Sequence, residues 1–173
     1  MNIYLCGMIG SGKTALGTIL AHRLGWPFFD LDQEMDRELG RSFHELVREQ
    51  GWLAFRELEY RVCKRFSRMK QTVSALGGGT VRYEWNTDLL RGTGMMIPLE
   101  ADLSILAARV RAVDRPRVNP GVSLDEDLRR IWASSAHLYR KAADLIYRTD
   151  MGKGLEKEVD DLLSLLQSRG VTG

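Results

Sequence analysis

The sequence has few cysteines and almost no net charge. Its two cysteines, Cys6 and Cys63, lie far apart among 173 residues, so they cannot by themselves form a CxxC redox pair or a zinc cluster. We expect both to be reduced core residues. The 25 basic and 23 acidic side chains leave a net charge of only +2, which argues against a nucleic-acid or membrane partner.

Long apolar runs are also missing. No segment approaches the roughly 18 to 20 consecutive apolar residues of a membrane-spanning helix, and the sequence lacks the basic start of a signal peptide. We therefore expect a cytoplasmic protein. Hydrophobic residues make up 44% of the chain and charged residues 28%, values typical of a globular domain with a single core. We predict one domain over residues 1–173 and a monomeric state.

Short apolar runs alternate with amphipathic segments along the chain. We predict strands at 3–6, 28–31, 72–76, 95–99 and 145–149. Helices are predicted at 16–24, 33–39, 43–50, 58–69, 103–110, 124–142 and 155–166. This alternation predicts a three-layer α/β/α fold with a five-stranded parallel sheet, in which ligands bind at the carboxyl ends of the strands.

A phosphate-binding motif follows the first predicted strand. Residues 7–14 read Gly-Met-Ile-Gly-Ser-Gly-Lys-Thr, a full match to G-x-x-x-x-G-K-[ST], and a predicted helix follows. Backbone N–H groups of such a loop surround phosphate oxygens, Lys13 reaches the outer phosphates, and the Thr14 hydroxyl can bind Mg²⁺. The alternative is a glycine-rich turn with a solvated lysine. The strand before the motif and the helix after it favour the phosphate-binding interpretation.

Two aspartates mark the end of the second predicted strand. If the strand continues, Asp30 and Asp32 point to opposite faces, and if it turns, both can face the ligand edge of the sheet. Asp30 is then a candidate Mg²⁺ ligand, directly or through water, and Asp32 is a candidate base for an attacking hydroxyl. The alternative is that one of the two only caps the following helix.

An arginine and a glutamate share one helix face further along. Arg56 and Glu59 are three residues apart, a spacing that usually gives a surface salt bridge of little consequence. The functional interpretation is an arginine held by the glutamate and aimed at a substrate carboxylate. From the spacing alone, the surface salt bridge is the favoured interpretation.

Several motifs occur together in a characteristic order. They are the loop at 7–14, Phe29-Asp30-Leu31-Asp32, Phe55-Arg56-x-x-Glu59, the glycines 77–79, Asp114-Arg115-Pro116, and Leu138-Tyr139 with Ala143-Asp144. In order and spacing this set resembles the shikimate kinases over nearly the whole chain. The resemblance implies a nucleoside-monophosphate-kinase-like core of the P-loop NTPase type. It also implies a substrate-binding segment over about 32–60 and a mobile lid over about 111–123.

The same resemblance implies roles for individual positions. ATP phosphates would be bound by Gly10, Ser11, Gly12, Lys13, Thr14, Ala15 and, from the lid, Arg115, with Arg109 or Arg111 against the adenine. Mg²⁺ would be bound by Thr14 and Asp30. The acceptor would be bound by Asp32, Arg56 and the backbone N–H groups of Gly78 and Gly79. The catalytic residues would be Lys13, Asp32 and Arg115.

The implied activity is the ATP-dependent phosphorylation of a shikimate hydroxyl to shikimate 3-phosphate, in aromatic amino-acid biosynthesis. Shikimate, ATP and Mg²⁺ are the expected ligands. Two alternatives stay open. One is a kinase of the same architecture that acts on another small hydroxy acid or a nucleoside monophosphate. The other is a nucleotide-binding regulator without transfer activity, against which the presence of Lys13, Thr14, Asp30, Asp32 and Arg115 argues.

The sequence departs from the family's pattern at two positions. Ser135 stands where members usually carry a second carboxylate-binding arginine, and Trp52 stands where a glutamate is common. The same-face helix neighbours of Ser135 offer no cation, so a replacement would come from elsewhere, for example Arg82 or Lys141. Without one, the lost contact predicts weaker acceptor binding by roughly one to two orders of magnitude.

Overall fold

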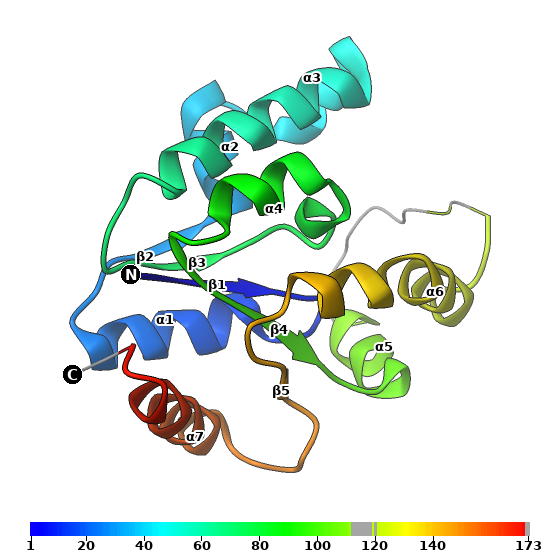
Figure 1. The fold of residues 1–173 in the computed structure, drawn as a ribbon. Helices are drawn as coiled ribbons and strands as arrows, with labels where there is room; N and C mark the ends of the chain where they lie inside the picture. The colour runs from blue at the N-terminus through cyan, green and yellow to red at the C-terminus, as the bar shows by residue number, and fades with distance from the viewer. Residues whose placement is uncertain (112–118, 120, 172–173) are drawn as a thin grey trace.

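A computed structural model describes residues 1–111, 119 and 121–171 (Figure 1). Arg115 and most of the lid predicted over 111–123 lie outside these residues, so both stay predictions. Within the described ranges, no helix combines the length and the apolar character needed to span a membrane.

The described strands form one parallel sheet in the order β2-β3-β1-β4-β5. Their bounds are β1 Asn2–Cys6, β2 Phe28–Asp30, β3 Val73–Ala75, β4 Gly94–Glu100 and β5 Tyr147–Arg148. In register, Leu5 of the central strand β1 lies opposite Ala75 and Ile97. The chain builds β2 and β3 on one side of β1 and then crosses over for β4 and β5. The carboxyl end of β1 is therefore a topological switch point, where α/β proteins bind ligands.

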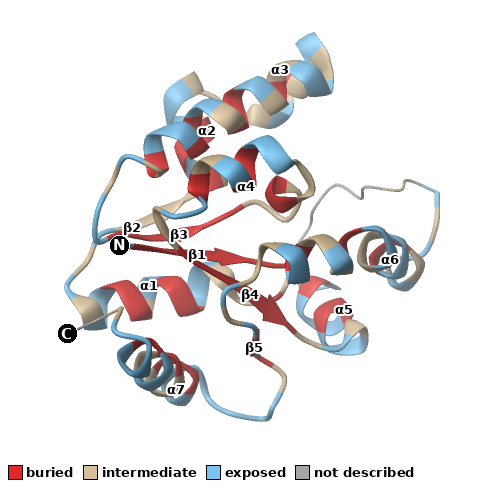
Figure 2. Cartoon of the chain, in the orientation of Figure 1, coloured by how far each residue is buried: buried red, intermediate tan, exposed pale blue. Residues whose placement is uncertain are grey.

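Helices cover both faces of the sheet, and Figure 2 shows β1, β3 and most of β4 buried between them, whereas β2 at the edge is only partly buried. Their bounds are α1 Lys13–Leu24, α2 Leu31–Leu39, α3 Phe43–Phe66, α4 Glu84–Leu90, α5 Leu103–Arg111, α6 Leu124–Ala142 and α7 Leu155–Ser168. The hydrophobic cluster with α1 and α7 contains Ile3 and Leu5, whereas the cluster with the other helices contains Tyr4 and Cys6. Strand β1 thus supplies both cores, because successive side chains of a strand point to opposite faces. The predicted three-layer α/β/α fold is confirmed.

Two boundaries near the candidate site are set by single residues. Leu31, predicted as the end of a strand, is instead the first residue of α2, because Asp30 caps that helix. The predicted stop at Gly51 is confirmed as an interruption inside α3, where the backbone adopts φ 82° and ψ 179°. Only glycine adopts this combination readily, so Gly51 divides α3 into two helical parts.

One segment that the sequence did not assign is regular in the structure. A short 3₁₀ turn, η1 Thr80–Arg82, leads into α4. The buried side chains of α4 are those of Asn86, Thr87 and Leu90. Because two of these three are polar, the helix lacks the apolar periodicity by which a buried face is predicted.

Candidate active site

The loop between β1 and α1 has the backbone of a phosphate-binding loop. Gly7 and Gly12 have φ values of 131° and 96°, and a Cβ placed on Gly7 would lie 2.5 Å from the carbonyl oxygen of Leu99. Glycine is therefore required at Gly7 both by backbone conformation and by space. The Lys13 Nζ donates hydrogen bonds to the carbonyl oxygens of Gly7 and Met8, each at 2.9 Å. The ammonium group is thus held at the loop that is expected to surround phosphate oxygens.

A cavity of about 520 Å³ lies at the carboxyl edge of the sheet. Its lining includes the loop residues Gly10, Gly12, Lys13, Thr14 and Ala15, together with Asp30, Asp32, Gly77, Gly78 and Arg109. Both predicted metal ligands and most of the predicted ATP residues therefore share one space with Asp32 and Gly78, whereas the acceptor residues Arg56 and Gly79 do not line it. Ser11 does not line it: its side chain is buried, and its hydroxyl has no hydrogen-bond partner among the described residues.

Asp30 both caps a helix and contacts the phosphate loop. Its Oδ1 accepts hydrogen bonds from the backbone N–H groups of Asp32 at 3.1 Å and Gln33 at 3.5 Å, while Oδ2 accepts one from Thr14 Oγ1 at 2.8 Å. The capping and ligand-binding interpretations are therefore compatible. Oxygens from a hydroxyl and a carboxylate are the ligands that Mg²⁺ prefers, with phosphate oxygens and water completing its coordination. The pair of Thr14 and Asp30 fits such an ion.

The turn after β2 brings the second aspartate into the same cavity. Because the strand ends at Asp30, Asp32 lies in the first turn of α2 and lines the cavity with Asp30. A Cβ placed on Gly77 would lie 3.4 Å from Asp32 Oδ1, so this carboxylate borders the loop after β3. Of the two geometries that the sequence left open, the turn is the one observed.

Arg56 and Glu59 do not form the surface salt bridge that their spacing favoured. Arg56 Nη1 lies 2.8 Å from Glu59 Oε2, and the side chain of Glu59 is only 1% exposed. Glu59 also accepts hydrogen bonds from Thr80 Oγ1 at 2.9 Å and Asn86 Nδ2 at 3.1 Å. The surface interpretation is wrong because η1 and α4 cover the glutamate, and a buried carboxylate with three donors holds its arginine in a defined position.

Three aromatic rings surround the same guanidinium. Arg56 Cζ lies 4.4 Å from the ring centroid of Tyr83, 4.7 Å from that of Phe55 and 5.8 Å from that of Trp52. Trp52 also packs edge-on against Phe55 while staying 62% exposed. The aromatic cage, meaning Trp52, Phe55 and Tyr83, restricts the guanidinium further by cation–π contacts. Sequence reasoning missed Thr80, Tyr83 and Asn86, which lie in a segment without apolar periodicity.

The glycine loop, Gly77–Gly79, connects the acidic and basic parts of the site. Asp32 borders its first residue, and a Cβ placed on its last residue would lie 3.3 Å from Arg56 Nη2. From Gly77 to Gly79 the chain spans at most about 7 Å. The Asp32 carboxylate and the Arg56 guanidinium therefore border the loop at two points separated by about the width of a small molecule. In the described part of the chain, the backbone N–H groups of Gly78 and Gly79 have no hydrogen-bond acceptor.

Of the two arginines predicted to lie against the adenine, Arg109 lines the cavity and Arg111 does not. The Arg109 guanidinium donates hydrogen bonds to the carbonyl oxygens of Gly10 at 3.2 Å and Thr149 at 2.6 Å. Arg111 instead pairs with Asp125 at 2.9 Å. Thr149, the residue after β5, also contacts the phosphate loop, because its Oγ1 donates a hydrogen bond to the carbonyl oxygen of Ser11 at 3.0 Å.

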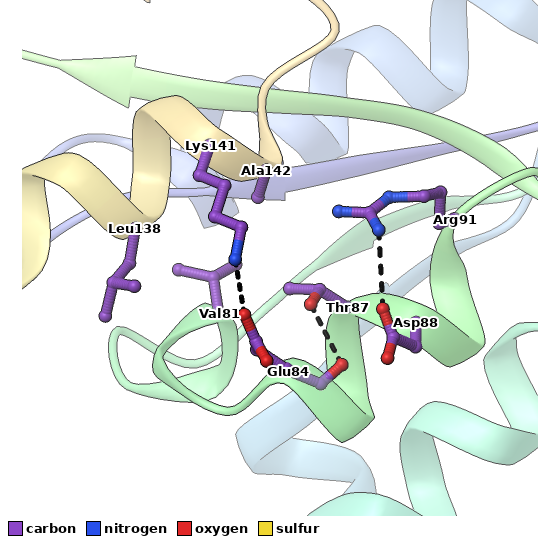
Figure 3. Close-up of a pocket in the computed structure, with 8 residues that line it drawn as sticks. All are labelled: Val81, Glu84, Thr87, Asp88, Arg91, Leu138, Lys141 and Ala142. Atoms are coloured by element: carbon purple, nitrogen blue, oxygen red, sulfur yellow. Dashed lines mark hydrogen bonds and ion pairs between the residues drawn. The ribbon is translucent and has the colours of Figure 1, made fainter.

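Ser135 is completely buried on α6, with its hydroxyl 3.4 Å from that of Ser134. Of the two cations considered as its replacement, Lys141 is paired with Glu84 and lines a separate cavity of about 240 Å³, which Val81 of η1 also lines. Figure 3 shows that the other cation of this cavity, Arg91, is directed at Asp88. Neither cation of the second cavity lines the first one.

The parallel sheet, the phosphate loop and the acidic pair beside it define a P-loop kinase for small molecules. The family model "Shikimate kinase" matches residues 9–167. A shikimate kinase from Symbiobacterium thermophilum is 37% identical over 176 residues, an alignment that covers 100% of both chains. The chain belongs to the shikimate kinase family.

Solved structures agree with this assignment. A shikimate kinase from Acinetobacter baumannii in complex with shikimate is similar with a TM-score of 0.89 and 30% identity, over 97% of this chain and 93% of that one. A shikimate kinase from Bacteroides thetaiotaomicron is similar with a TM-score of 0.86 and 29% identity, over 96% of this chain and 98% of that one. The likeness covers the whole fold and not the phosphate loop alone.

Proposed function

We propose that this protein transfers the γ-phosphoryl group of ATP to a hydroxyl of shikimate, giving shikimate 3-phosphate and ADP. The observation that carries the proposal is the glycine loop between Asp32 and Arg56, which opens onto the phosphate-binding cavity. Shikimate is a six-membered ring with a carboxylate at one position and hydroxyls across the ring. A base near one end of the loop and a guanidinium near the other match that arrangement.

The residues on the nucleotide side of the site bind the ATP phosphates and balance their negative charge. We propose that backbone N–H groups of residues 10–15 and the Lys13 ammonium bind the phosphates, and that Arg109, which lines the same cavity, lies against the adenine. Arg115 is proposed to reach the phosphates from the lid over 111–123. Lid closure would exclude water and so suppress ATP hydrolysis.

The Mg²⁺ that family members typically use with ATP would be held by Thr14 and Asp30. When bound, it supplies positive charge that neutralises the phosphate oxygens during transfer. In this chain Asp30 Oδ1 continues to cap α2, which fixes the position of Asp32 two residues later. The metal site and the base are thus connected by two peptide bonds.

On the acceptor side, Arg56 and the N–H groups of Gly78 and Gly79 bind the carboxylate and orient the ring. Asp32 accepts the proton of the attacking hydroxyl as its oxygen forms a bond to the γ-phosphorus, and the bond from phosphorus to the leaving oxygen of ADP breaks. Because both substrates are held against one rigid sheet edge, most of the acceleration comes from positioning and electrostatic stabilisation.

A coupled assay of ADP release tests the proposal. With ATP and Mg²⁺, we expect release that depends on shikimate and not on shikimate methyl ester at the same concentration or on a nucleoside monophosphate. Lys13→Ala should lower kcat/KM by about 100- to 1,000-fold, because it removes the ammonium charge that stabilises the phosphate oxygens in the transition state. Asp32→Asn should lower kcat by about 100-fold or more.

Asp36→Asn is the matched control on the same helix. Asp36 Oδ1 accepts a hydrogen bond from the backbone N–H of Phe43 at 2.7 Å, and Asp36 does not line the cavity. This variant should keep the activity of the wild type. Full activity of Asp32→Asn would remove Asp32 from the chemistry, and shikimate-independent ADP release would contradict the proposed function.

A further inference from the structure

A second arginine borders the glycine loop from another element. Arg82 is the last residue of η1, and its backbone N–H donates a hydrogen bond to the carbonyl oxygen of Gly79 at 3.1 Å. A Cβ placed on Gly79 would lie 3.8 Å from Arg82 Cδ and 3.3 Å from Arg56 Nη2. The side chains of two arginines therefore run past the same glycine, one from α3 and one from η1.

The two arginines differ in what balances their charge. Arg56 is paired with the buried carboxylate of Glu59. Arg82 Nη2 donates to a neutral oxygen, Ser134 Oγ, at 2.8 Å, and Arg82 makes no salt bridge within the described residues. The Ser134 hydroxyl donates its own proton to the carbonyl oxygen of Ile131 at 3.0 Å, so it is oriented as an acceptor toward Arg82. A neutral partner leaves the positive charge available to an anion.

Helix α6 contacts the same loop through a tyrosine hydroxyl. The Tyr139 hydroxyl donates a hydrogen bond to the carbonyl oxygen of Gly78. Burial raises the pKa of that hydroxyl, and the charge of Arg82 acts in the opposite direction. Tyr139 and Ser134 both belong to α6, so the loop lies between α3 with Arg56 and α6 with the serine that holds Arg82.

We propose that Arg82 is a second cationic ligand of the acceptor's carboxylate, beside Arg56, and that Ser134 holds its guanidinium in place before the acceptor binds. The inference rests on the proposed function, since that supplies the carboxylate. A carboxylate has two oxygens and can accept hydrogen bonds from two guanidinium groups. Arg82 thereby contributes to specificity for an acidic acceptor over a neutral one.

Arg82→Gln tests this proposal. We expect its KM for shikimate to rise about 10- to 100-fold, because one charge-assisted hydrogen bond is lost, while KM for ATP stays within about twofold of the wild type. Arg82→Lys retains the charge and should recover part of the affinity. Arg91→Gln is the matched control, because Arg91 is a nearby arginine that lines the second cavity and pairs with Asp88. Its KM for shikimate should not change.

Shikimate methyl ester separates charge recognition from a structural role. The ester carries no carboxylate, so its inhibition constant against shikimate should be the same for the wild type and Arg82→Gln. An equal loss of affinity for acid and ester would overturn the proposal, as would an unchanged KM for shikimate in Arg82→Gln. Either result leaves the proposed function intact if the wild type uses shikimate. A wild type that releases no ADP with shikimate overturns the proposed function, and this proposal with it.

Discussion

At the scale of single residues, the site depends on a carboxylate that water hardly reaches. Glu59 is 1% exposed and accepts hydrogen bonds from Arg56, Thr80 and Asn86. Its three donors come from three elements, α3, η1 and α4, so the guanidinium position depends on how these elements pack. Removing the negative charge of Glu59 should therefore weaken acceptor binding and leave ATP binding unchanged.

Glu59→Gln should raise KM for shikimate about tenfold and leave KM for ATP unchanged, because an amide cannot replace a charge-assisted acceptor worth about 1.5 kcal/mol or more. Steady-state kinetics with each substrate varied in turn measures both values. Glu34→Gln is the matched control, since Glu34 is another buried glutamate, held by Arg37 and Arg65 away from the cavity. Equal KM effects in the two variants would show that buried charge in general, and not the position of Arg56, sets acceptor affinity.

The pairing of Arg56 with Glu59 also shows where sequence reasoning reached its limit. The spacing predicted the pair correctly, but burial decides what the pair does, and the burial comes from residues 80–90. That segment carries Asn86 and Thr87 on its buried face, so no apolar pattern predicts that it covers anything. The phosphate loop could be predicted because its function depends on consecutive backbone groups.

At the scale of elements, the interruption of α3 separates two parts with different contacts. Residues 43–50 precede Gly51, and the part after it carries Arg56 and Glu59. The backbone at Gly51 lies in a region that is essentially restricted to glycine. A side chain at Gly51 would change the direction of the part of α3 that follows it. The aromatic cage would then be displaced as well.

Gly51→Ala should lower the free energy of unfolding by about 1 to 3 kcal/mol, measured by urea denaturation. Gly154→Ala is the matched control, because Gly154 has φ −70° and ψ 155°, a conformation open to alanine, and a Cβ there would meet no atom within 4 Å. Its cost should stay below about 1 kcal/mol. If Gly51→Ala were as stable as the wild type, the backbone conformation at the interruption would not be strained for a residue with a side chain.

At the scale of the whole molecule, both thiols lie inside one of the two cores. Cys6 ends β1 directly before the phosphate loop, and Cys63 lies on α3. Burial raises the pKa of the Cys6 thiol to about 12 and that of Cys63 further, so both are neutral at physiological pH. The thiolate is the reactive form, and neither side chain is accessible to solvent.

A thiol reagent such as DTNB should therefore label no cysteine in the native protein within minutes and both in denaturant. Cys63→Ala identifies which thiol accounts for any slow labelling. Rapid labelling of one thiol under native conditions would contradict the packing of that core, and protection by ATP would then assign the opening to the phosphate loop.

The alternation along β1 has a consequence for engineering this chain. Residues 3 and 5 face one core, residues 4 and 6 face the other, and the phosphate loop begins at the next residue. Adding or deleting one residue in this strand would exchange the two sets of side chains and shift the loop by one peptide. Reporter peptides or new termini thus belong in an exposed turn such as the one at Gly92, where chain length can change while the order of faces in the central strand is kept.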